Sequence, residues 1–289
     1  MYSLDPMVIG RFAPSPTGPL HMGSLVAAAA SWLDARAAGG RWLVRIEDLD
    51  QPRAVPGAAE HILQTLERLG LRWDGDVVYQ SARRSLYEDA LQRLQGHTYW
   101  CRCTRREIAD SSLGLAVDGA HIYPGTCRAG TIREGRSLRV RTGSEQIRYR
   151  DRLQGEQAQV LERDIGDFVL YRADGLFAYQ LAVVVDDGVQ GVTDVVRGAD
   201  LLDSTPRQIF LQRLLGLPTP RYLHVPVAVN AQGEKLAKQT GAEAVQATWE
   251  SLREVLRFLG QPDAANLDQA VRQWDPALIS PRRALAPAP

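Results

Sequence analysis

The chain has 289 residues, of which 45% are hydrophobic and 24% charged, a balance typical of a globular protein with two domains or one elaborated domain. Its formal net charge is zero, so no overall field attracts it to nucleic acid. No apolar run reaches the roughly 18 residues that a transmembrane helix needs, and the first residues lack the charged-then-apolar order of a signal peptide. We therefore expect a cytoplasmic protein with no membrane contact.

The first hundred residues predict a βαβ unit and then two helices. Residues 7–12 form an apolar run typical of a strand, and a loop rich in Pro and Gly separates them from an alanine-rich helix that ends at Gly39 and Gly40. The run RWLVRIEDLD returns to strand character, which predicts parallel pairing through a right-handed crossover. Residues 57–70 and 82–95 have the periodicity of amphipathic helices.

The pattern changes between Tyr99 and Arg163, where turn residues and short alternating runs predict a small β-rich insertion. Alternation of β and α resumes at DFVLYR, and it includes a helix at TPRQIFLQRLLGL and a strand at HVPVAVN. Residues 243–273 predict helix, and the Pro-rich tail SPRRALAPAP predicts disorder. The expected fold is α/β, with a Rossmann-type parallel sheet split by the insertion and a short helical C-terminal segment. The four expected segments are 1–100, 101–165, 166–240 and 241–289.

Basic residues are unevenly distributed. Eight arginines crowd one stretch, where they indicate either a solvated strand face or a patch that binds a polyanion: Arg128, Arg133, Arg136, Arg139, Arg141, Arg148, Arg150 and Arg152. Of the 34 basic residues only two are lysines, Lys235 and Lys238, which lie close together. This pair indicates a function for a compact charge on a flexible stem, a role that the planar guanidinium of Arg fills poorly.

The loop after the first predicted strand is a candidate nucleotide site. Such a loop lies at the carboxyl edge of a parallel sheet, and the helix after it offers unpaired N–H groups and a positive dipole end to phosphate. His21 is placed to donate to phosphate oxygens, and Gly23 lets a nucleotide approach the backbone. Alternatively, His21 is only a helix-start residue with a satisfied hydrogen bond. The rigid prolines before it and Gly23 after it favour the nucleotide interpretation.

The two lysines form a second candidate site, since they follow a predicted strand and a turn. From a loop near the sheet edge they can reach the phosphates of a nucleotide, where charge grows as pyrophosphate leaves. The alternative is an ordinary solvated loop.

These two segments, HMGS at 21–24 and KLAKQ at 235–239, resemble the HIGH and KMSKS signatures of class I aminoacyl-tRNA synthetases. The runs RFAPSPTGPLHMGS, IEDLDQPR, WDGD and YQLAVVVDDGVQGVTDVVRGADLL are similar to the glutamyl/glutaminyl subgroup, over residues 7–240. The resemblance implies activation of glutamate by ATP with magnesium. It assigns catalytic roles to His21, Lys235 and Lys238, and ATP contacts to His21, Gly23, Ser24 and Lys238.

Two departures narrow the resemblance. The printed sequence has no large anticodon-binding domain after the lysines, and Val183 stands where glutamyl-tRNA synthetases usually place an asparagine. Both features are similar to the glutamyl-Q tRNA(Asp) synthetase family, which implies transfer of glutamate to queuosine in the anticodon of tRNA(Asp). The alternatives are a minimal glutamyl-tRNA synthetase that charges the 3′ end of a tRNA, a non-catalytic tRNA-binding remnant, and a nucleotidyltransferase with a similar His-containing loop.

A pocket selective for glutamate needs cationic groups for two carboxylates and an anion for the ammonium. Arg11 and Arg197 are candidates for the carboxylates, because Arg grips a carboxylate through two hydrogen bonds. Glu47 is the candidate for the ammonium, and Tyr179 adds a hydroxyl; a structural ion pair between Glu47 and Arg197 is the alternative. The resemblance places six residues in this pocket: Arg11, Ala13, Ser15, Glu47, Tyr179 and Arg197.

All three cysteines lie in the predicted insertion, at Cys101, Cys103 and Cys127. A disulfide is disfavoured in the cytosol, and clustered thiolates favour a structural Zn²⁺, although free buried cysteines are the alternative. Three thiolates leave a tetrahedral site one ligand short, and His121 is the ordinary choice for the fourth. The resemblance instead implies Tyr123, four residues before the last cysteine. The other histidines, His61, His97 and His224, show no partner in the sequence and receive no role.

Overall fold

The computed structural model describes residues 7–112, 114–116, 119–130, 135–230, 232–236 and 243–286. The helices are α1 (Met22–Ala37), α2 (Ala58–Arg68), α3 (Arg84–Arg93), α4 (Arg105–Ser111), α5 (Leu161–Asp164), α6 (Tyr179–Val189), α7 (Thr205–Leu214), α8 (Trp249–Phe258) and α9 (Leu267–Gln273). The strands are β1 (Ile9–Phe12), β2 (Arg41–Ile46), β3 (Val78–Tyr79), β4 (Thr98–Cys101), β5 (Ser137–Val140), β6 (Gln146–Asp151), β7 (Gly155–Val160), β8 (Val169–Tyr171), β9 (Asp194–Gly198), β10 (Arg221–Val225), β11 (Val227–Ala228) and β12 (Ala284–Leu285). None of the helices in these ranges is both long and apolar enough to span a bilayer.

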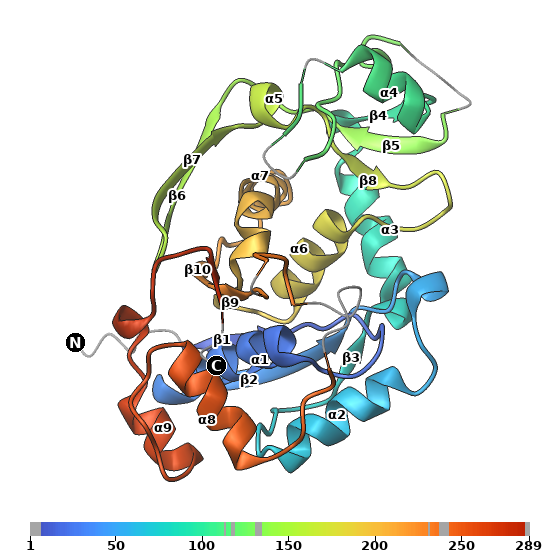
Figure 1. Ribbon diagram of the computed structural model, residues 1–289. Helices are drawn as coiled ribbons and strands as arrows, with labels where there is room; N and C mark the ends of the chain where they lie inside the picture. The colour runs from blue at the N-terminus through green and yellow to red at the C-terminus, as the bar shows by residue number, and fades with distance from the viewer. Residues whose placement is uncertain are drawn as a thin grey trace, which may run out of the picture.

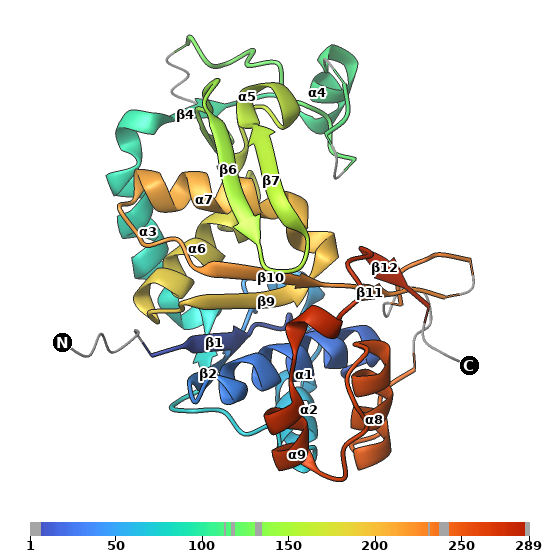
Figure 2. The same ribbon diagram turned by 90° about the vertical axis from the view of Figure 1, so that its left-hand side faces the viewer.

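The centre of the molecule is built from parallel strands. β2 pairs in parallel with β1 and with β3, and β9 pairs in parallel with β10. The backbone N–H of Thr193, just before β9, donates to the carbonyl of Ile9 at 3.0 Å, so β9 lies beside β1, as Figure 2 shows. The predicted α/β fold with a parallel sheet is therefore confirmed, including the first βαβ unit.

Helices cover both faces of these strands, as parallel strands require. Successive residues of a strand point to opposite faces. Val196 and Leu223 accordingly join the core beneath α1, α8 and α9, whereas Val195 and Tyr222 join the core beneath α3, α6 and α7. Figure 1 shows these two groups of helices on opposite sides of the strands.

The two glycines after the first helix are needed for different reasons. Gly39 ends the helix with φ +65°, a left-handed conformation that residues with a side chain rarely adopt. A Cβ on Gly40 would lie 2.8 Å from the Cβ of Val8 and even closer to its carbonyl oxygen, so β1 and β2 can approach only if this residue lacks a side chain. The helices predicted at 57–70 and 82–95 are confirmed as α2 and α3.

The segment between the two halves of the parallel sheet contains two antiparallel units, at the top of Figure 1. β4, β5 and β8 form one sheet, and β6 with β7 forms a long hairpin. The hairpin is attached to the parallel strands, because β6 runs parallel to β10 with Asp151 opposite Tyr222.

The C-terminal part differs from the prediction in three places. The helix predicted over 243–273 is two helices, α8 and α9, separated at Gly260, whose φ is +68°. The strand predicted at HVPVAVN divides into β10 and β11 at Pro226, which has no N–H to donate. The expectation of a disordered tail is wrong for residues up to Ala286, because the short Pro-free run before it forms β12 and pairs with β11. The prediction of disorder rested on the composition of the whole tail, in which prolines flank this short run.

Candidate active site

A cavity of about 550 Å³ lies where β1, β2 and β9 end. Its walls come from the loop after β1, the first residue after β2, the start of α6, the end of β9 and the lysine loop. Ten of the candidate residues line this one cavity: Arg11, Ala13, Ser15, His21, Gly23, Ser24, Glu47, Tyr179, Arg197 and Lys235. Lys238 lies outside the described residues. The structure thus brings together segments that are far apart in the sequence.

The loops around the cavity are tied to each other by backbone contacts. The N–H of Glu47 donates to the carbonyl of Pro14 at 2.9 Å, which joins the end of β2 to the loop after β1. A Cβ on Gly23 would lie 3.1 Å from the carbonyl oxygen of Leu236, so the lysine loop packs against the first turn of α1. Lys235 forms an ion pair with Asp200, which also lines the cavity.

His21 is the N-cap of α1. Its Nδ1 accepts a hydrogen bond from the N–H of Ser24 at 3.4 Å, and the hydroxyl of Ser24 accepts one from the N–H of His21 at 2.8 Å. The interpretation of His21 as a hydrogen-bonded helix-start residue is therefore correct for Nδ1. The imidazole also lines the cavity, so capping holds the ring beside the helix N-terminus, where phosphate is favoured.

A buried charge network lies beneath the cavity. Arg45 is fully buried and contacts Asp187 at 2.8 Å, Glu47 at 3.4 Å and Asp186 at 3.7 Å. Arg11 contacts the same Asp187 oxygen at 3.3 Å. Asp187 therefore holds the guanidinium groups of two neighbouring strands. Arg45, Asp186 and Asp187 were not predicted from the sequence, although charges inside the apolar runs RWLVRI and YQLAVVVDD were the available signal.

Glu47 has an unusual environment for a carboxyl group. Its side chain is 10% exposed, and burial raises its pKa to about 7 although Arg45 and Arg11 act in the opposite direction. The alternative interpretation, an ion pair between Glu47 and Arg197, named the wrong arginine, because Glu47 pairs with Arg45. Such a carboxyl group changes charge near neutral pH.

Arg197 is held on several sides. Its Nε donates to Nε2 of His224 at 3.0 Å, its Nη2 donates to the hydroxyl of Thr205 at 2.9 Å, and its Nη1 lies 3.4 Å from the hydroxyl of Tyr179. Burial raises the pKa of Tyr179 above its usual value, so this hydroxyl is protonated. His224, which received no role from the sequence, is fully buried and contacts Arg197 on one side and Asp151 on the other.

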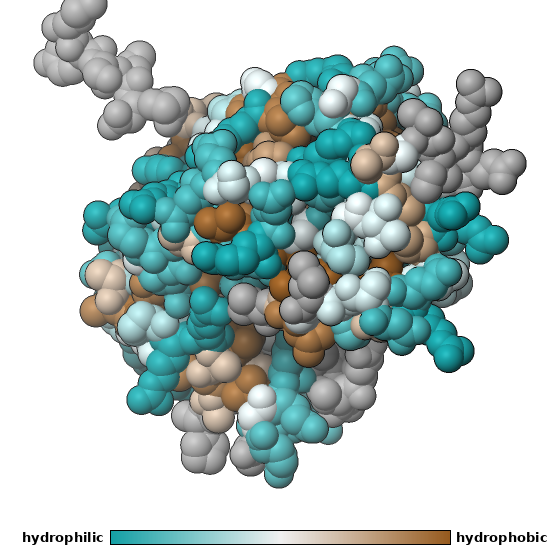
Figure 3. Space-filling model, turned by 90° about the horizontal axis from the view of Figure 1, so that it is seen from above, coloured by the Kyte–Doolittle hydropathy of each residue, from teal (hydrophilic) through white to brown (hydrophobic). Residues whose placement is uncertain are grey.

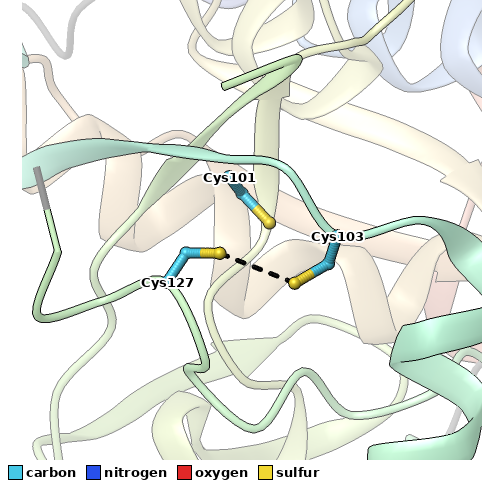
Figure 4. Close-up of side chains that lie close together, drawn as sticks. All are labelled: Cys101, Cys103 and Cys127. Atoms are coloured by element: carbon cyan, nitrogen blue, oxygen red, sulfur yellow. Dashed lines mark hydrogen bonds between the residues drawn. The ribbon is translucent and has the colours of Figure 1, made fainter. Parts of the chain in front are cut away.

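The three cysteines of the insertion also come together (Figure 4). Their sulfur atoms all lie within 4.8 Å of one another, and those of Cys103 and Cys127 are 3.5 Å apart. The hydroxyl of Tyr123 lies 3.4 Å from the sulfur of Cys101 and 3.8 Å from that of Cys103. The clustered thiols could hold a metal ion.

Tyr123 and His121 differ in exposure. Tyr123 is 4% exposed and belongs to the small core that contains two of the cysteines, whereas His121 is exposed. Burial raises the pKa of the Cys103 thiol to about 11. Burial alone would also raise the pKa of Cys127, but hydrogen bonds from Tyr123 and from the backbone of Arg102 outweigh it and lower that pKa to about 7.

Comparison with known proteins identifies the family. Residues 7–259 match the family model described as tRNA synthetases class I (E and Q), catalytic domain. The chain belongs to this family. Curated relatives named glutamyl-Q tRNA(Asp) synthetase include one from Dechloromonas aromatica, 59% identical over 92% of this chain and 91% of the relative. Another, from Verminephrobacter eiseniae, is 56% identical over 95% of this chain and 97% of the relative.

Solved structures agree with this assignment at the level of the fold. A glutamate-tRNA synthetase from Elizabethkingia anophelis has a TM-score of 0.79 and 24% identity, over 96% of this chain and 68% of that chain. A glutamate tRNA ligase from Elizabethkingia meningosepticum, solved in complex with its amino acid, has the same TM-score, identity and coverage of this chain. The chain thus shares its α/β fold with these class I synthetases.

Within this class I synthetase fold, Val183 lies one turn after Tyr179 on α6 and is 1% exposed. It belongs to the apolar core and is not among the residues that line the cavity in the described structure. An asparagine at this depth would need buried partners for its amide, so Val183 suits the apolar packing around it.

The arginine-rich stretch of this synthetase is largely structural. Arg139 lies 4.0 Å over the ring of Tyr123, and Arg152 contacts Asp34 at 2.6 Å. Arg128 and Arg141 also bind backbone carbonyls of neighbouring segments. Arg136, Arg148 and Arg150 are exposed, and Arg133 lies outside the described residues. Neither a uniform solvated face nor a continuous polyanion patch describes these side chains.

The face seen from above in Figure 3 carries the insertion and is mainly hydrophilic, with hydrophobic residues in small separate groups. Among the described residues of the insertion and of the strand that leads into it, Leu115 and Trp100 are the large apolar side chains with substantial exposure, at 63% and 41%. Isolated exposed apolar residues of this kind are ordinary on a protein surface.

Proposed function

We propose that this chain activates L-glutamate with ATP to form glutamyl-adenylate, and then transfers the glutamyl group to queuosine in the anticodon of tRNA(Asp). The observation that carries the proposal is the single cavity that unites two arginines, a carboxyl group, a helix N-terminus and a lysine. Membership of the class I E and Q family and the names of the curated relatives support it. A cytoplasmic location fits a tRNA substrate.

The amino acid would lie among six residues of the cavity. Arg11 and Arg197 are suited to the two carboxylates, since each presents several fixed donors, and Glu47 as a carboxylate is suited to the ammonium. Tyr179 adds a hydroxyl beside Arg197. Ala13 and Ser15 leave room for the ligand beside these charges.

ATP would lie along the first turn of α1. His21 and Ser24 shape this turn, Gly23 keeps the backbone accessible, and the helix dipole favours phosphate. A carboxylate oxygen of glutamate attacks the α-phosphorus, the bond to the β-phosphate breaks, and pyrophosphate leaves with the electron pair. Lys235 and Lys238 would neutralise the charge that grows on pyrophosphate, and magnesium bound with ATP would add to this neutralisation.

In the second step, a hydroxyl of the queuosine attacks the acyl carbon of glutamyl-adenylate. AMP leaves, the hydroxyl loses its proton, and an ester forms. Positioning and charge stabilisation account for both steps, so no nucleophilic side chain is needed.

We further propose that Cys101, Cys103, Tyr123 and Cys127 hold a structural Zn²⁺. Sulfur ligands about 2.3 Å from a tetrahedral zinc ion lie about 3.8 Å from one another, and the 3.5 Å between the sulfurs of Cys103 and Cys127 is close to that value. The Tyr123 hydroxyl lies 3.4 Å and 3.8 Å from the sulfurs of Cys101 and Cys103. The ion would hold the insertion in shape. We propose that this insertion spans residues 101–165 and separates the two halves of the catalytic core, 1–100 and 166–240. The C-terminal segment, 241–289, follows the core. It would take no part in the chemistry.

The first experiment is ATP–pyrophosphate exchange without tRNA, with glutamate, glutamine or aspartate as the only amino acid. We expect exchange with glutamate alone. Exchange that needs glutamine or aspartate, or no amino acid, would defeat the proposal. The second experiment follows labelled glutamate onto tRNA(Asp) with and without queuosine and onto tRNA(Glu). Label on queuosine-containing tRNA(Asp) is expected, and label on tRNA(Glu) alone would favour a minimal glutamyl-tRNA synthetase.

A further inference from the structure

A chain of three buried polar side chains runs from the inserted hairpin to the cavity. Asp151 ends β6, His224 lies in β10 and Arg197 lies in β9, and their exposures are 1%, 0% and 4%. Oδ2 of Asp151 lies 2.6 Å from Nδ1 of His224, and Nε2 of His224 lies 3.0 Å from Nε of Arg197. Figure 2 shows β9 beside β10, with the hairpin of β6 and β7 rising from β10.

The direction of each hydrogen bond in this chain is determined by chemistry. The guanidinium of Arg197 only donates, so Nε2 of His224 accepts and the single proton of a neutral imidazole is on Nδ1. That proton is donated to Asp151. Burial lowers the pKa of His224 to about 4, and Arg197 adds to the effect, so the ring is neutral at physiological pH. Burial alone would raise the pKa of Asp151, but the hydrogen bonds from His224 and from backbone amides outweigh it and lower that pKa.

We infer that Asp151 is a positioning residue, which selects the tautomer of His224 and through it orients Arg197 for glutamate. This inference rests on the proposed function, in which Arg197 binds a carboxylate of the substrate. His224 and Thr205 occupy Nε and Nη2 of Arg197, which leaves Nη1, beside Tyr179, for the ligand. The hairpin of the insertion thereby supports the amino-acid pocket without contacting the cavity.

Asp151 has a second task that any test must preserve. Its Oδ1 accepts hydrogen bonds from the N–H groups of Leu153 at 2.9 Å, Gln154 at 2.8 Å and His224 at 3.3 Å, and these shape the hairpin turn. In Asp151→Asn the three donors require the amide oxygen at the Oδ1 position. The amide NH₂ then faces Nδ1 of His224.

Asp151→Asn therefore reverses the tautomer with hardly any change in shape. Nδ1 of His224 becomes the acceptor and the proton moves to Nε2, where it faces the Nε–H of Arg197. The hydroxyl of Thr205, 3.2 Å from Nε2, can accept this proton, but the Nε–H of Arg197 still loses its acceptor. The same exchange at the carboxylate of a Ser-His-Asp triad also leaves geometry intact and gives the wrong tautomer. We expect the KM for glutamate in ATP–pyrophosphate exchange to rise about tenfold or more, the effect of losing one charge-assisted hydrogen bond, while the KM for ATP changes less than about twofold.

Two variants of His224 form a matched pair. In His224→Gln the amide oxygen reaches the position of Nε2 and still accepts from Arg197, so we expect a KM for glutamate near that of the wild type. In His224→Asn the shorter amide keeps the contact with Asp151 but not the one with Arg197, so we expect the increase seen in Asp151→Asn. Asp164→Asn is the control. Asp164 also accepts a hydrogen bond from a backbone N–H of the insertion, that of Val160, but it does not contact Asp151, His224 or Arg197.

The tautomer is measured directly from the imidazole ¹⁵N shifts of His224, assigned by their loss in His224→Gln, and the Arg197 Nε–H is followed by its rate of hydrogen exchange. We expect the Nδ1–H tautomer and a protected Nε–H in the wild type, and the Nε2–H tautomer with faster Nε–H exchange in Asp151→Asn. An unchanged tautomer, or a reversed tautomer with an unchanged KM for glutamate, would overturn the inference. If the wild type shows no glutamate-dependent exchange, the proposed function fails, while the two NMR measurements still decide whether Asp151 orients Arg197.

Discussion

Binding of glutamate should weaken as the pH falls through neutrality, because the proposed role of Glu47 requires its carboxylate form to hold the ammonium group. Burial raises the pKa of this carboxyl to about 7 in the ligand-free protein. The charged groups that face it are Arg45 from β2, Arg11 from β1, and Asp186 and Asp187 from α6. The aspartates oppose its ionisation and the arginines favour it.

The magnitude follows from this pKa. With a pKa of about 7, roughly nine tenths of Glu47 is carboxylate at pH 8 and roughly one tenth at pH 6. Apparent affinity falls in proportion to the competent fraction, so the KM for glutamate should rise about tenfold between pH 8 and pH 6. Glu47→Gln should show a higher KM at every pH and no such slope. The assay is ATP–pyrophosphate exchange at saturating ATP, with the KM for ATP measured at each pH as the control. A flat profile in the wild type, or the same slope in Glu47→Gln, would refute the reasoning.

The same pKa has a consequence for stability with a defined sign. The folded pKa of Glu47 lies above the usual value of 4.5, so the folded state binds the proton more tightly than the unfolded state. The stabilisation is fully present below about pH 4.5 and is lost as the pH rises through about 7. The shift corresponds to about 3 kcal/mol. Relative to Glu47→Gln, the ligand-free wild type should therefore lose unfolding free energy between pH 5 and pH 8, measured in urea; a difference that stays constant with pH would contradict the assigned pKa.

Three further predictions address the lysine loop, the metal and the core. Lys238→Ala should slow exchange at least about tenfold with little change in the KM for glutamate, and an unchanged rate would remove this lysine from the mechanism. Native mass spectrometry should find one zinc ion in freshly purified protein and none in Cys127→Ser, whose thermal midpoint should be lower; protein without zinc would refute the site. Leu223→Ala, at a residue of β10 that has no exposed surface and packs in the core beneath α1, α8 and α9, should cost about 3 kcal/mol in urea unfolding without changing the KM for ATP. A loss below about 1 kcal/mol would mean that this strand is less tightly packed than the structure indicates.

Local patterns in the sequence were sufficient for most of the fold. The alanine-rich run before Gly39 and the periodic segments at 57–70 and 82–95 carry their own helix signals, and the structure has helices there. The tail was predicted wrongly, because composition averaged over ten residues conceals a run as short as β12. The strand HVPVAVN was assigned as one element although Pro226 interrupts its hydrogen bonding.

The sequence motifs also pointed to residues that the structure places around one cavity. His21 and Lys235 carry recognisable motifs, and both line the cavity. The residues that support the site were missed, since their partners are distant in the chain. Arg11 and Asp187 are 176 residues apart, and Asp151 and His224 are 73 apart, so neither pair leaves a local pattern. A lone histidine in a strand gives no indication of its partners until the strands are placed.

The buried charges beneath the cavity are better explained by function than by stability. Removing Arg45 and its carboxylates from water costs several kcal/mol per ion before their attraction offsets it, and apolar side chains of similar volume would fold at least as well. What the network provides is orientation. Asp187 holds Arg11, and His224 holds Arg197, so neither long side chain must lose rotamer freedom when glutamate binds. Glu47 contacts Arg45 at 3.4 Å, and in the proposed function the ammonium group of glutamate replaces this weak contact. Arg45 then keeps its ion pair with Asp187 at 2.8 Å.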